Sequence, residues 1–364
     1  SLGQSDFKSP KHAVDATIKA LKDGQHGYTL PNGIIECREA VSRKIKNLYN
    51  ADIDPERIVI MPGGKPTMHY GISFFGEPGA EIIYPDPGFP IYESMINYTG
   101  AKAVPFDMTE NRDFSINPDK VLSLINENTR LLILNNPHNP TGGFTEKTVI
   151  DKLAKGLKNF PHVSILCDEI YDRLIFDNKE IPTFFNYPDL YNRLIVLNGW
   201  SKTYAMTGWR VGGSIGPKTI INIISKLNVN AESCTTHFIQ SAVVEALTGD
   251  QSGAQNILNT LRERRDATVA GLNAIDGIDI PTPRSTFYLF PNVTEIMKRK
   301  RFDKIEQLQV YALENANVSF CTREHFGRPL SDETEFFIRF AYSGITVDDI
   351  NEGMAKLKTC FETS

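Results

Sequence analysis

The chain has 364 residues, of which 41% are hydrophobic and 23% charged, a composition that excludes a largely disordered or fibrous protein. Its 39 basic and 44 acidic residues give a formal net charge of −5, which provides no general attraction for nucleic acid or for an anionic membrane. No apolar run approaches the roughly 18 residues of a membrane span, no signal peptide is visible, and the five scattered cysteines lack a CxxC pair. We therefore expect a cytoplasmic protein with no nucleic acid or membrane as partner.

The predicted elements begin with two helices, over residues 10–21 and 33–49, where apolar side chains recur every three or four positions. From residue 57 onward, short β-branched runs alternate with helical patterns such as the one over residues 145–158. Such alternation predicts a mostly parallel seven-stranded sheet with helices on both faces, a three-layer α/β sandwich. The expected strands cover residues 57–61, 80–84, 101–106, 130–134, 163–167, 194–197 and 210–214.

The last quarter of the chain has a different pattern. An Arg-rich helix over residues 256–274, with interleaved acids, is interpreted as a solvated or interdomain face. Short strands punctuated by prolines follow at 287–290 and 336–340, and a final helix covers residues 347–361. We interpret residues 27–275 as a large domain, and residues 1–26 with 276–364 as a smaller α+β domain.

A lysine and an arginine follow the strand expected at 194–197. Lys202 comes after Ser201, and Arg210 lies eight residues further on, between aromatic and small residues. A lysine held away from bulk water loses its charge readily and can form a Schiff base. The planar fork of an arginine suits a phosphate dianion. A lone lysine in such a place is usually an ordinary surface residue, so the pair gains its meaning only beside other motifs.

Three further motifs follow other expected strands. Asp168 ends an apolar strand, where a parallel sheet places ligand groups, and a carboxylate there can keep a pyridinium nitrogen protonated. Asn139 lies in a loop made rigid by two prolines and two glycines. Gly63 and Gly64 precede Pro66 at the start of an expected helix, an arrangement that makes an anion site from backbone N–H groups. Each motif alone is weak, because turns and helix caps often have such residues.

Together, and in this order, the motifs resemble those of the pyridoxal-phosphate-dependent aminotransferases of fold type I, the aspartate-aminotransferase-like superfamily. The resemblance is carried by Ser-Lys…Gly-Trp-Arg-Val-Gly over residues 201–212, His-Asn-Pro-Thr-Gly over 138–142 and Asp-Glu-Ile-Tyr over 168–171, and it extends from Gly3 to the C-terminus. It implies transfer of the amino group of an α-amino acid to a 2-oxo acid by a ping-pong mechanism. The cofactor would be pyridoxal 5'-phosphate, bound as a Schiff base to Lys202.

The resemblance also implies roles for residues around the cofactor. Lys202 would move the proton between substrate and cofactor, and Asp168 would pair with the pyridine nitrogen. Asn139 and Tyr171 would hydrogen-bond the cofactor O3′, and Phe89 would stack on the ring. The groups implied for the phosphate are Gly63, Gly64, the backbone N–H of Lys65, Ser201 and Arg210.

For the substrate and the assembly, the resemblance implies three further roles. Arg339 would bind the α-carboxylate bidentately, and Gly3 and Asn139 would line the same pocket. Tyr28 would reach the phosphate of a neighbouring subunit, which makes a homodimer part of the active site. The histidines show no HxxxH or HxH pairing, so no metal site is expected.

Two stretches depart from the family pattern. Residues 284–286 read Arg-Ser-Thr where relatives have Gly-Ala, and residues 320–327 read Phe-Cys-Thr-Arg-Glu-His-Phe-Gly in place of Pro-Gly-x-x-Phe-Gly. Both are expected near the pocket mouth, where they indicate either an unusual side-chain preference or neutral drift. A second substrate carboxylate would need another cation. The conceivable ones are Lys65, Arg284, Arg323 and Arg328, and the sequence does not choose among them.

The same residues would also serve other carbanion chemistry. Lys202, Asp168 and Arg339 suit a carbon–sulfur β-lyase or a related lyase on this scaffold, so the lyase stays open as the alternative function. A cofactor-binding regulator is a third class, and it is disfavoured because no DNA-binding pattern precedes the catalytic one.

Overall fold

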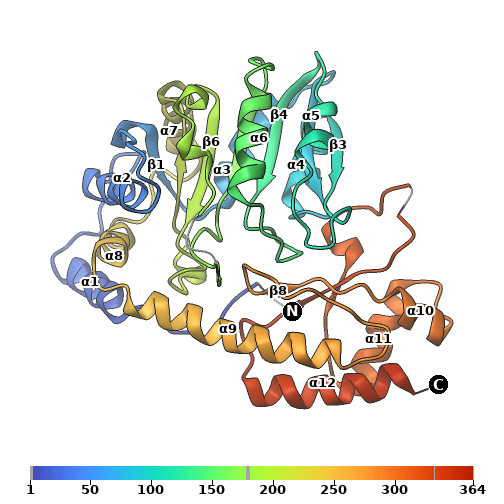
Figure 1. Ribbon diagram of the computed structural model, residues 1–364. Coiled ribbons are helices and arrows are strands. Elements are labelled where there is room, and N and C mark those ends of the chain that lie inside the picture. The colour runs from blue at the N-terminus through green and yellow to red at the C-terminus, as the bar shows by residue number, and fades with distance from the viewer. Residues whose placement is uncertain (1–2, 178–180, 332, 364) are drawn as a thin grey trace.

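A seven-stranded sheet forms the centre of the computed structural model, which describes residues 3–177, 181–331 and 333–363 (Figure 1). The strand order is β1-β7-β6-β5-β4-β2-β3, and only β7 runs antiparallel to its two neighbours. The predicted mostly parallel sheet of seven strands is therefore confirmed. The strands are β1 (Ile58–Met61), β2 (Glu81–Asp86), β3 (Lys102–Asp107), β4 (Thr129–Asn135), β5 (Ser164–Asp168), β6 (Leu194–Gly199) and β7 (Gly212–Ile215).

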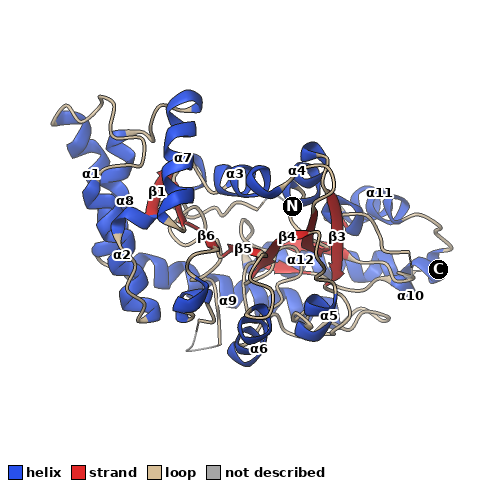
Figure 2. Cartoon of the chain, turned by 90° about the horizontal axis from the view of Figure 1, so that it is seen from above, coloured by secondary structure: helices blue, strands red, loops and turns tan. Residues whose placement is uncertain are grey.

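Both faces of this sheet are buried, because successive side chains of a strand point to opposite faces. In β4, Leu131 and Ile133 belong to a core shared with α3 (Lys65–Phe75) and α4 (Ile91–Thr99). Leu132 and Leu134 belong to a second core, shared with α5 (Pro118–Ser123) and α6 (Lys147–Leu157). Figure 2 shows α3 and α4 on one side of the strands and α5 and α6 on the other, which confirms the three-layer sandwich.

The first helices lie at the β1 end of the sheet. Helix α1 (Lys11–Lys22) packs on α8 (His237–Thr248), and its Ala13 belongs to the same core as the sheet. Helix α2 (Ile35–Tyr49) also contacts α8, and α7 (Lys218–Ala231) covers the opposite face of β1. The division into residues 27–275 on one side and residues 1–26 with 276–364 on the other stays a prediction.

The C-terminal part has its own core and a small antiparallel sheet. Strand β10 (Ile338–Ala341) lies between β8 (Tyr288–Leu289) and β9 (Cys321–Thr322). Helices α10 (Thr294–Lys300), α11 (Ile305–Ala316) and α12 (Val347–Glu362) pack around it. Helix α9 (Ser252–Asn273) runs along the lower edge of Figure 1 from α1 to α12. Short 3₁₀ turns lie at Pro55–Arg57, Phe184–Asn186, Pro188–Leu190, Thr207–Trp209 and Arg323–Phe326.

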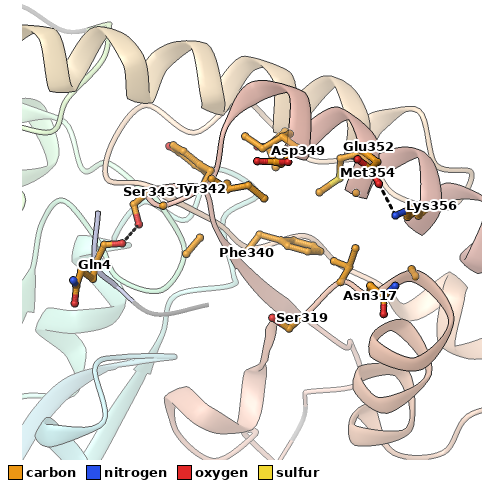
Figure 3. Close-up of a pocket in the computed structure, with 18 residues that line it drawn as sticks. Gln4, Asn317, Ser319, Phe340, Tyr342, Ser343, Asp349, Glu352, Met354 and Lys356 are labelled. Atoms are coloured by element: carbon orange, nitrogen blue, oxygen red, sulfur yellow. Dashed lines mark hydrogen bonds and ion pairs between the residues drawn. The ribbon is translucent and has the colours of Figure 1, made fainter. Parts of the chain in front are cut away.

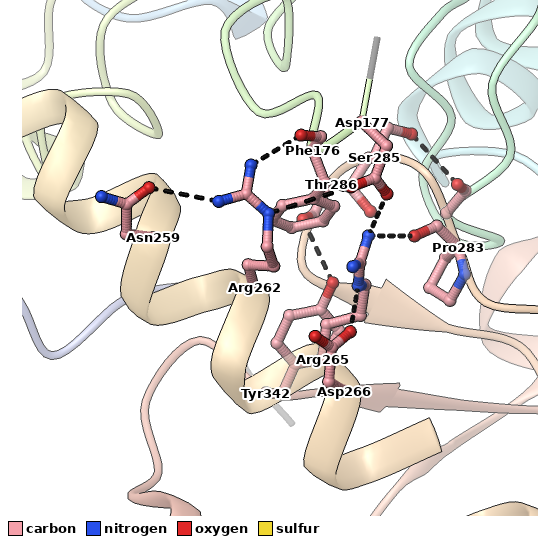
Figure 4. A network of polar contacts seen from close by, with 11 residues as sticks. Phe176, Asp177, Asn259, Arg262, Arg265, Asp266, Pro283, Ser285, Thr286 and Tyr342 are labelled. Carbon is pink, nitrogen blue, oxygen red and sulfur yellow. Dashed lines mark hydrogen bonds and ion pairs between the residues drawn. The ribbon is translucent and has the colours of Figure 1, made fainter. Parts of the chain in front are cut away.

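Arginines of the Arg-rich helix α9 contact segments that are distant in the sequence. Arg265 is buried, and its Nη1 lies 2.6 Å from Asp177 Oδ2 and 3.2 Å from the carbonyl oxygen of Pro283 (Figure 4). Arg264 forms a bidentate pair with Asp6, with both distances 2.8 Å. Arg264 and Arg265 are therefore not solvated, and the interdomain interpretation stays a prediction.

Several element boundaries differ from the prediction, and two of these differences have a local reason. The strand expected to begin at residue 210 begins at Gly212, because Arg210 adopts a left-handed backbone with φ 54°. The helix expected from residue 256 begins at Ser252, because Asp250 accepts a hydrogen bond from the Ser252 N–H and orders the turn before it. Among the described residues, no helix is both long and apolar enough to cross a bilayer.

Candidate active site

A cavity of about 450 Å³ lies where β4, β5 and β6 end and the C-terminal part approaches them. This is the edge at which open α/β sheets bind ligands. Eleven of the thirteen residues implied by the resemblance line the cavity, although they come from segments spread over most of the chain. They are Gly3, Gly64, Lys65, Phe89, Asn139, Asp168, Tyr171, Ser201, Lys202, Arg210 and Arg339.

Lys202 stands just beyond the end of β6, with Ser201 beside it. Its Nζ donates a hydrogen bond to the backbone carbonyl of Gly3. The pKa of the Lys202 amine is lowered to about 8, mainly by burial and further by the positive charges of Arg210 and Arg339. Because the neutral amine is the nucleophilic form, this environment prepares Lys202 to attack a carbonyl group.

Asp168 is the last residue of β5 and is buried. Its Oδ2 accepts a hydrogen bond of 2.7 Å from the hydroxyl of Tyr92, and its Oδ1 accepts one of 3.1 Å from the backbone N–H of Ile170. Burial raises the pKa of Asp168 to about 6, while these two hydrogen bonds act to lower it. A buried carboxylate of this kind gains most from a cationic partner.

Arg339 lies on β10, and its guanidinium lies close to two aromatic rings. Its Cζ is 4.3 Å from the centroid of the Tyr288 ring and 4.4 Å from that of Phe326. Its Nη1 donates a hydrogen bond of 2.9 Å to Asn139 Oδ1, which fixes the plane of the guanidinium. A guanidinium oriented in this way is suited to bidentate recognition of a carboxylate.

An anion cradle lies at the N-terminus of α3. Gly63 has a left-handed backbone with φ 101°, and an added Cβ would lie 2.3 Å from Arg210 Nη2, so only glycine fits there. Gly64 caps the helix, Pro66 has no N–H, and the Thr67 N–H donates to the carbonyl oxygen of Gly64, so the N–H groups of Gly64 and Lys65 are the ones without an intrahelical partner. Together with the Arg210 guanidinium, these N–H groups can bind a phosphate.

Two aromatic residues implied for the cofactor also line the cavity. The Tyr171 hydroxyl lies 3.0 Å from that of Tyr288, and burial raises the pKa of Tyr171 well above its usual range. The ring of Phe89 lies edge-on to Tyr92, with the centroids 6.2 Å apart, and Lys65 Nζ is 5.8 Å from the Phe89 centroid. Tyr171 thus enters the site as a neutral hydroxyl.

The remaining two predicted residues lie outside the cavity lining. Gly63 stands directly behind it, against Arg210. Tyr28 is 88% exposed and does not line the cavity of its own chain. Its predicted role concerns a neighbouring subunit and stays a prediction.

The structure also brings residues to the site that the sequence did not single out for it. Tyr92 follows Phe89 by three residues, so helical spacing after that motif was the available signal. Tyr288 and Phe326 fall within or beside the two stretches that depart from the family pattern. The sequence therefore indicated that they lie near the pocket but gave no role for them. Tyr92 itself does not line the cavity. Besides Tyr288 and Phe326, the lining residues that the sequence did not single out are Met68, Pro90, Ile170, Leu197, Thr207, Cys321 and His325.

A second and larger cavity, of about 550 Å³, lies beside α12 and β10 (Figure 3). Its polar lining includes Asp349, Glu352 and Lys356, and the last two form an ion pair of 2.6 Å. None of the residues implied by the resemblance is among the described residues that line it. In the part of the chain that the structure describes, no cluster of three His, Cys, Asp or Glu side chains could hold a metal ion. The candidate catalytic and binding residues therefore lie in the smaller cavity.

Comparison with known proteins agrees with this geometry. The family model for class I and II aminotransferases matches residues 1–357. The chain is 32% identical over 367 residues to the probable aspartate aminotransferase of Methanocaldococcus jannaschii, covering 99% of this chain and 92% of that protein. The structure superposes on an aspartate aminotransferase from Rhizobium meliloti with a TM-score of 0.91 at 29% identity, covering 100% of this chain and 90% of that one.

A second solved structure has the same fold and a different name. An aromatic aminotransferase from Pyrococcus horikoshii superposes with a TM-score of 0.92 at 27% identity, covering 99% of this chain and 94% of that one. The likeness thus extends over enzymes of more than one substrate preference.

The fold and the site define an α/β enzyme with a buried nucleophilic lysine. The chain belongs to the class I and II aminotransferases. It transfers the amino group of an α-amino acid to a 2-oxo acid, as the sequence predicts, and its relatives do not favour the lyase alternative.

Proposed function

We propose that this aminotransferase uses pyridoxal phosphate and takes a dicarboxylic amino acid of the aspartate class as amino donor. The observation that carries the proposal is the charge of the cavity. Among the described residues that line it, the cations are Lys65, Lys202, Arg210 and Arg339, and the one carboxylate is Asp168. Such an excess of positive charge, in a chain of net charge −5, favours a ligand set with several negative charges.

The residues of the cavity fit the cofactor. When bound, pyridoxal phosphate supplies an aldehyde that takes up the amino group and a protonated ring that accepts negative charge. Lys202 offers an amine of lowered pKa for the aldehyde. The Gly63 turn and Arg210 offer a cradle for the phosphate, and Asp168 offers a buried carboxylate for the ring nitrogen.

The chain's own residues divide the work of transfer. Lys202 Nζ would accept the proton from the substrate Cα and deliver it to the cofactor, since a pKa near 8 lets the amine both take up and release a proton near neutral pH. Arg339 binds the α-carboxylate, and its hydrogen bond to Asn139 holds the fork in orientation. Tyr171 and Asn139 would donate hydrogen bonds to the ring oxygen of the cofactor.

Lys65 is the cation proposed for the second carboxylate. The other three candidates have different surroundings: Arg284 pairs with Glu146 at 2.6 Å, Arg323 is buried in an ion cluster, and Arg328 is exposed. Lys65 lines the cavity beside Phe89, and the other lining cations have roles already. The name of the Methanocaldococcus relative, a probable aspartate aminotransferase, supports the same substrate class.

The proposal includes a homodimer in which Tyr28 reaches the partner's phosphate. Tyr28 and Leu30 are large hydrophobic residues that a single chain leaves 88% and 63% exposed. Contiguous exposed apolar groups of this kind are typical of an interface.

The experiment is a donor panel with the cofactor-loaded enzyme, in which kcat/KM is measured for aspartate, alanine and phenylalanine with 2-oxoglutarate as acceptor. We expect aspartate to lead, and Lys65→Met to lower its kcat/KM by about 10- to 100-fold while alanine changes by less than about twofold. The matched control is Lys22→Met, at an exposed lysine of α1. A preference for alanine or phenylalanine in the unaltered enzyme would contradict the substrate class.

A second variant tests the α-carboxylate site separately. Arg339→Ala should raise KM for every α-amino acid by about 100-fold and leave the cofactor content unchanged. An unchanged KM would move that role to another residue.

A further inference from the structure

A buried ion cluster joins the C-terminal part to the edge of the main sheet, next to the active site. Asp86 is the last residue of β2, Arg323 begins the short 3₁₀ helix Arg323–Phe326, and Glu333 lies in the loop before β10. Their side chains are 2%, 3% and 7% exposed. We call these three residues the Arg323 cluster.

Arg323 bridges the two carboxylates of this cluster. Its Nη2 lies 2.5 Å from Asp86 Oδ1. Its Nε and Nη2 donate hydrogen bonds of 3.0 Å each to the two oxygens of Glu333, a bidentate pair. Such fork geometry fixes both the distance and the orientation of the partners.

Backbone contacts next to the Arg323 cluster join the same two segments of the chain. The N–H of Gly88 donates a hydrogen bond of 2.8 Å to the carbonyl oxygen of Phe326. Gly327 has φ 123°, and an added Cβ would lie 2.6 Å from the oxygens of Asp86, so the segment lies directly on the end of β2. The loop held in this way is the one that carries Phe89 into the cavity.

Burial of these charges is costly. It raises the pKa of Asp86 to about 6, although Arg323 acts to lower it. Replacing a buried ion cluster with apolar side chains is often neutral or stabilising, so stability alone is a weak reason to keep one. A better reason for burying these charges is given by the contacts at the other end of the 3₁₀ helix Arg323–Phe326.

That other end is Phe326. Its ring centroid lies 4.4 Å from Cζ of Arg339, and that of Tyr288 lies 4.3 Å from the same atom. We propose that Arg323, through its pairs with Asp86 and Glu333, is a positioning residue that holds Phe326 against Arg339 and so sets the affinity for the substrate α-carboxylate. The inference rests on the proposed function, since it takes Arg339 as the carboxylate-binding residue.

The test uses the cofactor-loaded enzyme and the variant Arg323→Met. Both the amino acid and the 2-oxo acid carry an α-carboxylate, so KM for both should rise by about tenfold, with kcat changed by less than about threefold. The dissociation constant of the cofactor should stay unchanged. A purely structural role would instead lower kcat, cofactor content and thermal stability together.

Arg328→Met is the matched control, because Arg328 lies on the same segment and reaches Glu93 at 3.4 Å but is 85% exposed. It should leave both KM values unaltered. An equal rise in this control would show that any positive charge on the segment suffices, and the proposal would fail.

Two further variants decide the matter if Arg323→Met does not fold. Arg323→Lys keeps the charge without the fork and should raise both KM values less than tenfold. Phe326→Leu leaves the ion cluster intact and removes the ring, and it should raise both KM values by about tenfold. Normal KM values in Phe326→Leu would overturn the proposal.

The variant Arg339→Ala distinguishes failure of this proposal from failure of the proposed function. If Arg339→Ala also has a normal KM, the proposed function has failed at Arg339, whereas a high KM in Arg339→Ala alone would refute only the role of Arg323.

Discussion

The hydroxyl of Tyr92 donates a hydrogen bond of 2.7 Å to Oδ2 of Asp168, from the core between α4 and the sheet. This bond favours the charged form of a carboxyl group whose pKa burial raises to about 6. Tyr92 therefore contacts the carboxylate of the proposed cofactor site without lining the cavity itself.

Removal of this donor should weaken cofactor binding in a pH-dependent way. In Tyr92→Phe the pKa of Asp168 should rise by about one unit, which lowers its ionised fraction about fivefold at pH 6 and hardly at all at pH 8. The ratio of the cofactor dissociation constants of variant and parent, measured by fluorescence titration of the apoenzyme, should follow this change. Tyr84→Phe, near Asp86, is the control, and a ratio independent of pH would contradict the role of Tyr92.

Lys202 should react as an amine with a pKa near 8. Its neutral fraction is then about 9% at pH 7 and about 90% at pH 9, whereas a lysine of ordinary pKa remains almost wholly charged over this range. The rate of cofactor incorporation into the apoenzyme should therefore rise about tenfold from pH 7 to 9 and level off above it. Stopped-flow absorbance measures this rate, and a rise that continues tenfold per pH unit to pH 10 would exclude the lowered pKa.

Glu169 should make the protein less stable as the pH rises. Burial raises the pKa of Glu169 from 4.5 to about 8, with Thr183 as hydrogen-bond donor at 2.8 Å. The folded state holds a proton that the unfolded state releases above about pH 4.5, so this contribution is complete below pH 4.5 and lost as pH rises through 8. Glu169→Gln should match the parent Tm at pH 5 and exceed it at pH 8, in scanning calorimetry of the apoenzyme.

The control for that experiment is Glu127→Gln, at an exposed carboxylate, which should have the same Tm as the parent at both pH values. If Glu169→Gln shifted Tm equally at pH 5 and pH 8, the residue would be ionised in the folded protein and the interpretation would be wrong.

Variants at Tyr28 and Leu30 should distinguish the loss of the dimer from the loss of a single contact to the cofactor. Leu30→Glu should produce monomers in sedimentation equilibrium, because it places a charge in the proposed interface, and cofactor affinity should fall as the dimer is lost. Tyr28→Phe should stay dimeric yet bind the cofactor about tenfold more weakly, since only one hydrogen bond to a charged group is lost. Leu313→Glu, at an exposed leucine of α11, controls for surface charge. Full activity in a monomer would refute the shared site.

Local pattern in the sequence was sufficient for much of the molecule. The apolar run at Leu131–Leu134 predicts a strand buried on both faces, and the structure has Leu131 and Leu132 in opposite cores. The motifs around Lys202, Asp168 and Asn139 placed part of the cavity lining, because these residues lie at or just beyond the ends of β6, β5 and β4 and parallel strands end at one edge. Such information lies within a few neighbouring residues, where strand period and turn chemistry act.

Contacts between distant segments were decided only by the tertiary structure. Arg339 hydrogen-bonds Asn139, 200 residues away in the chain, and no local pattern states which aromatic side chains lie against its guanidinium. The sequence left four cations open for a second carboxylate, and packing placed Lys65 in the cavity and buried Arg323 between two acids. The physical reason is that strand runs and turn residues act over a few positions, whereas a side chain's partners depend on how whole layers pack against one another.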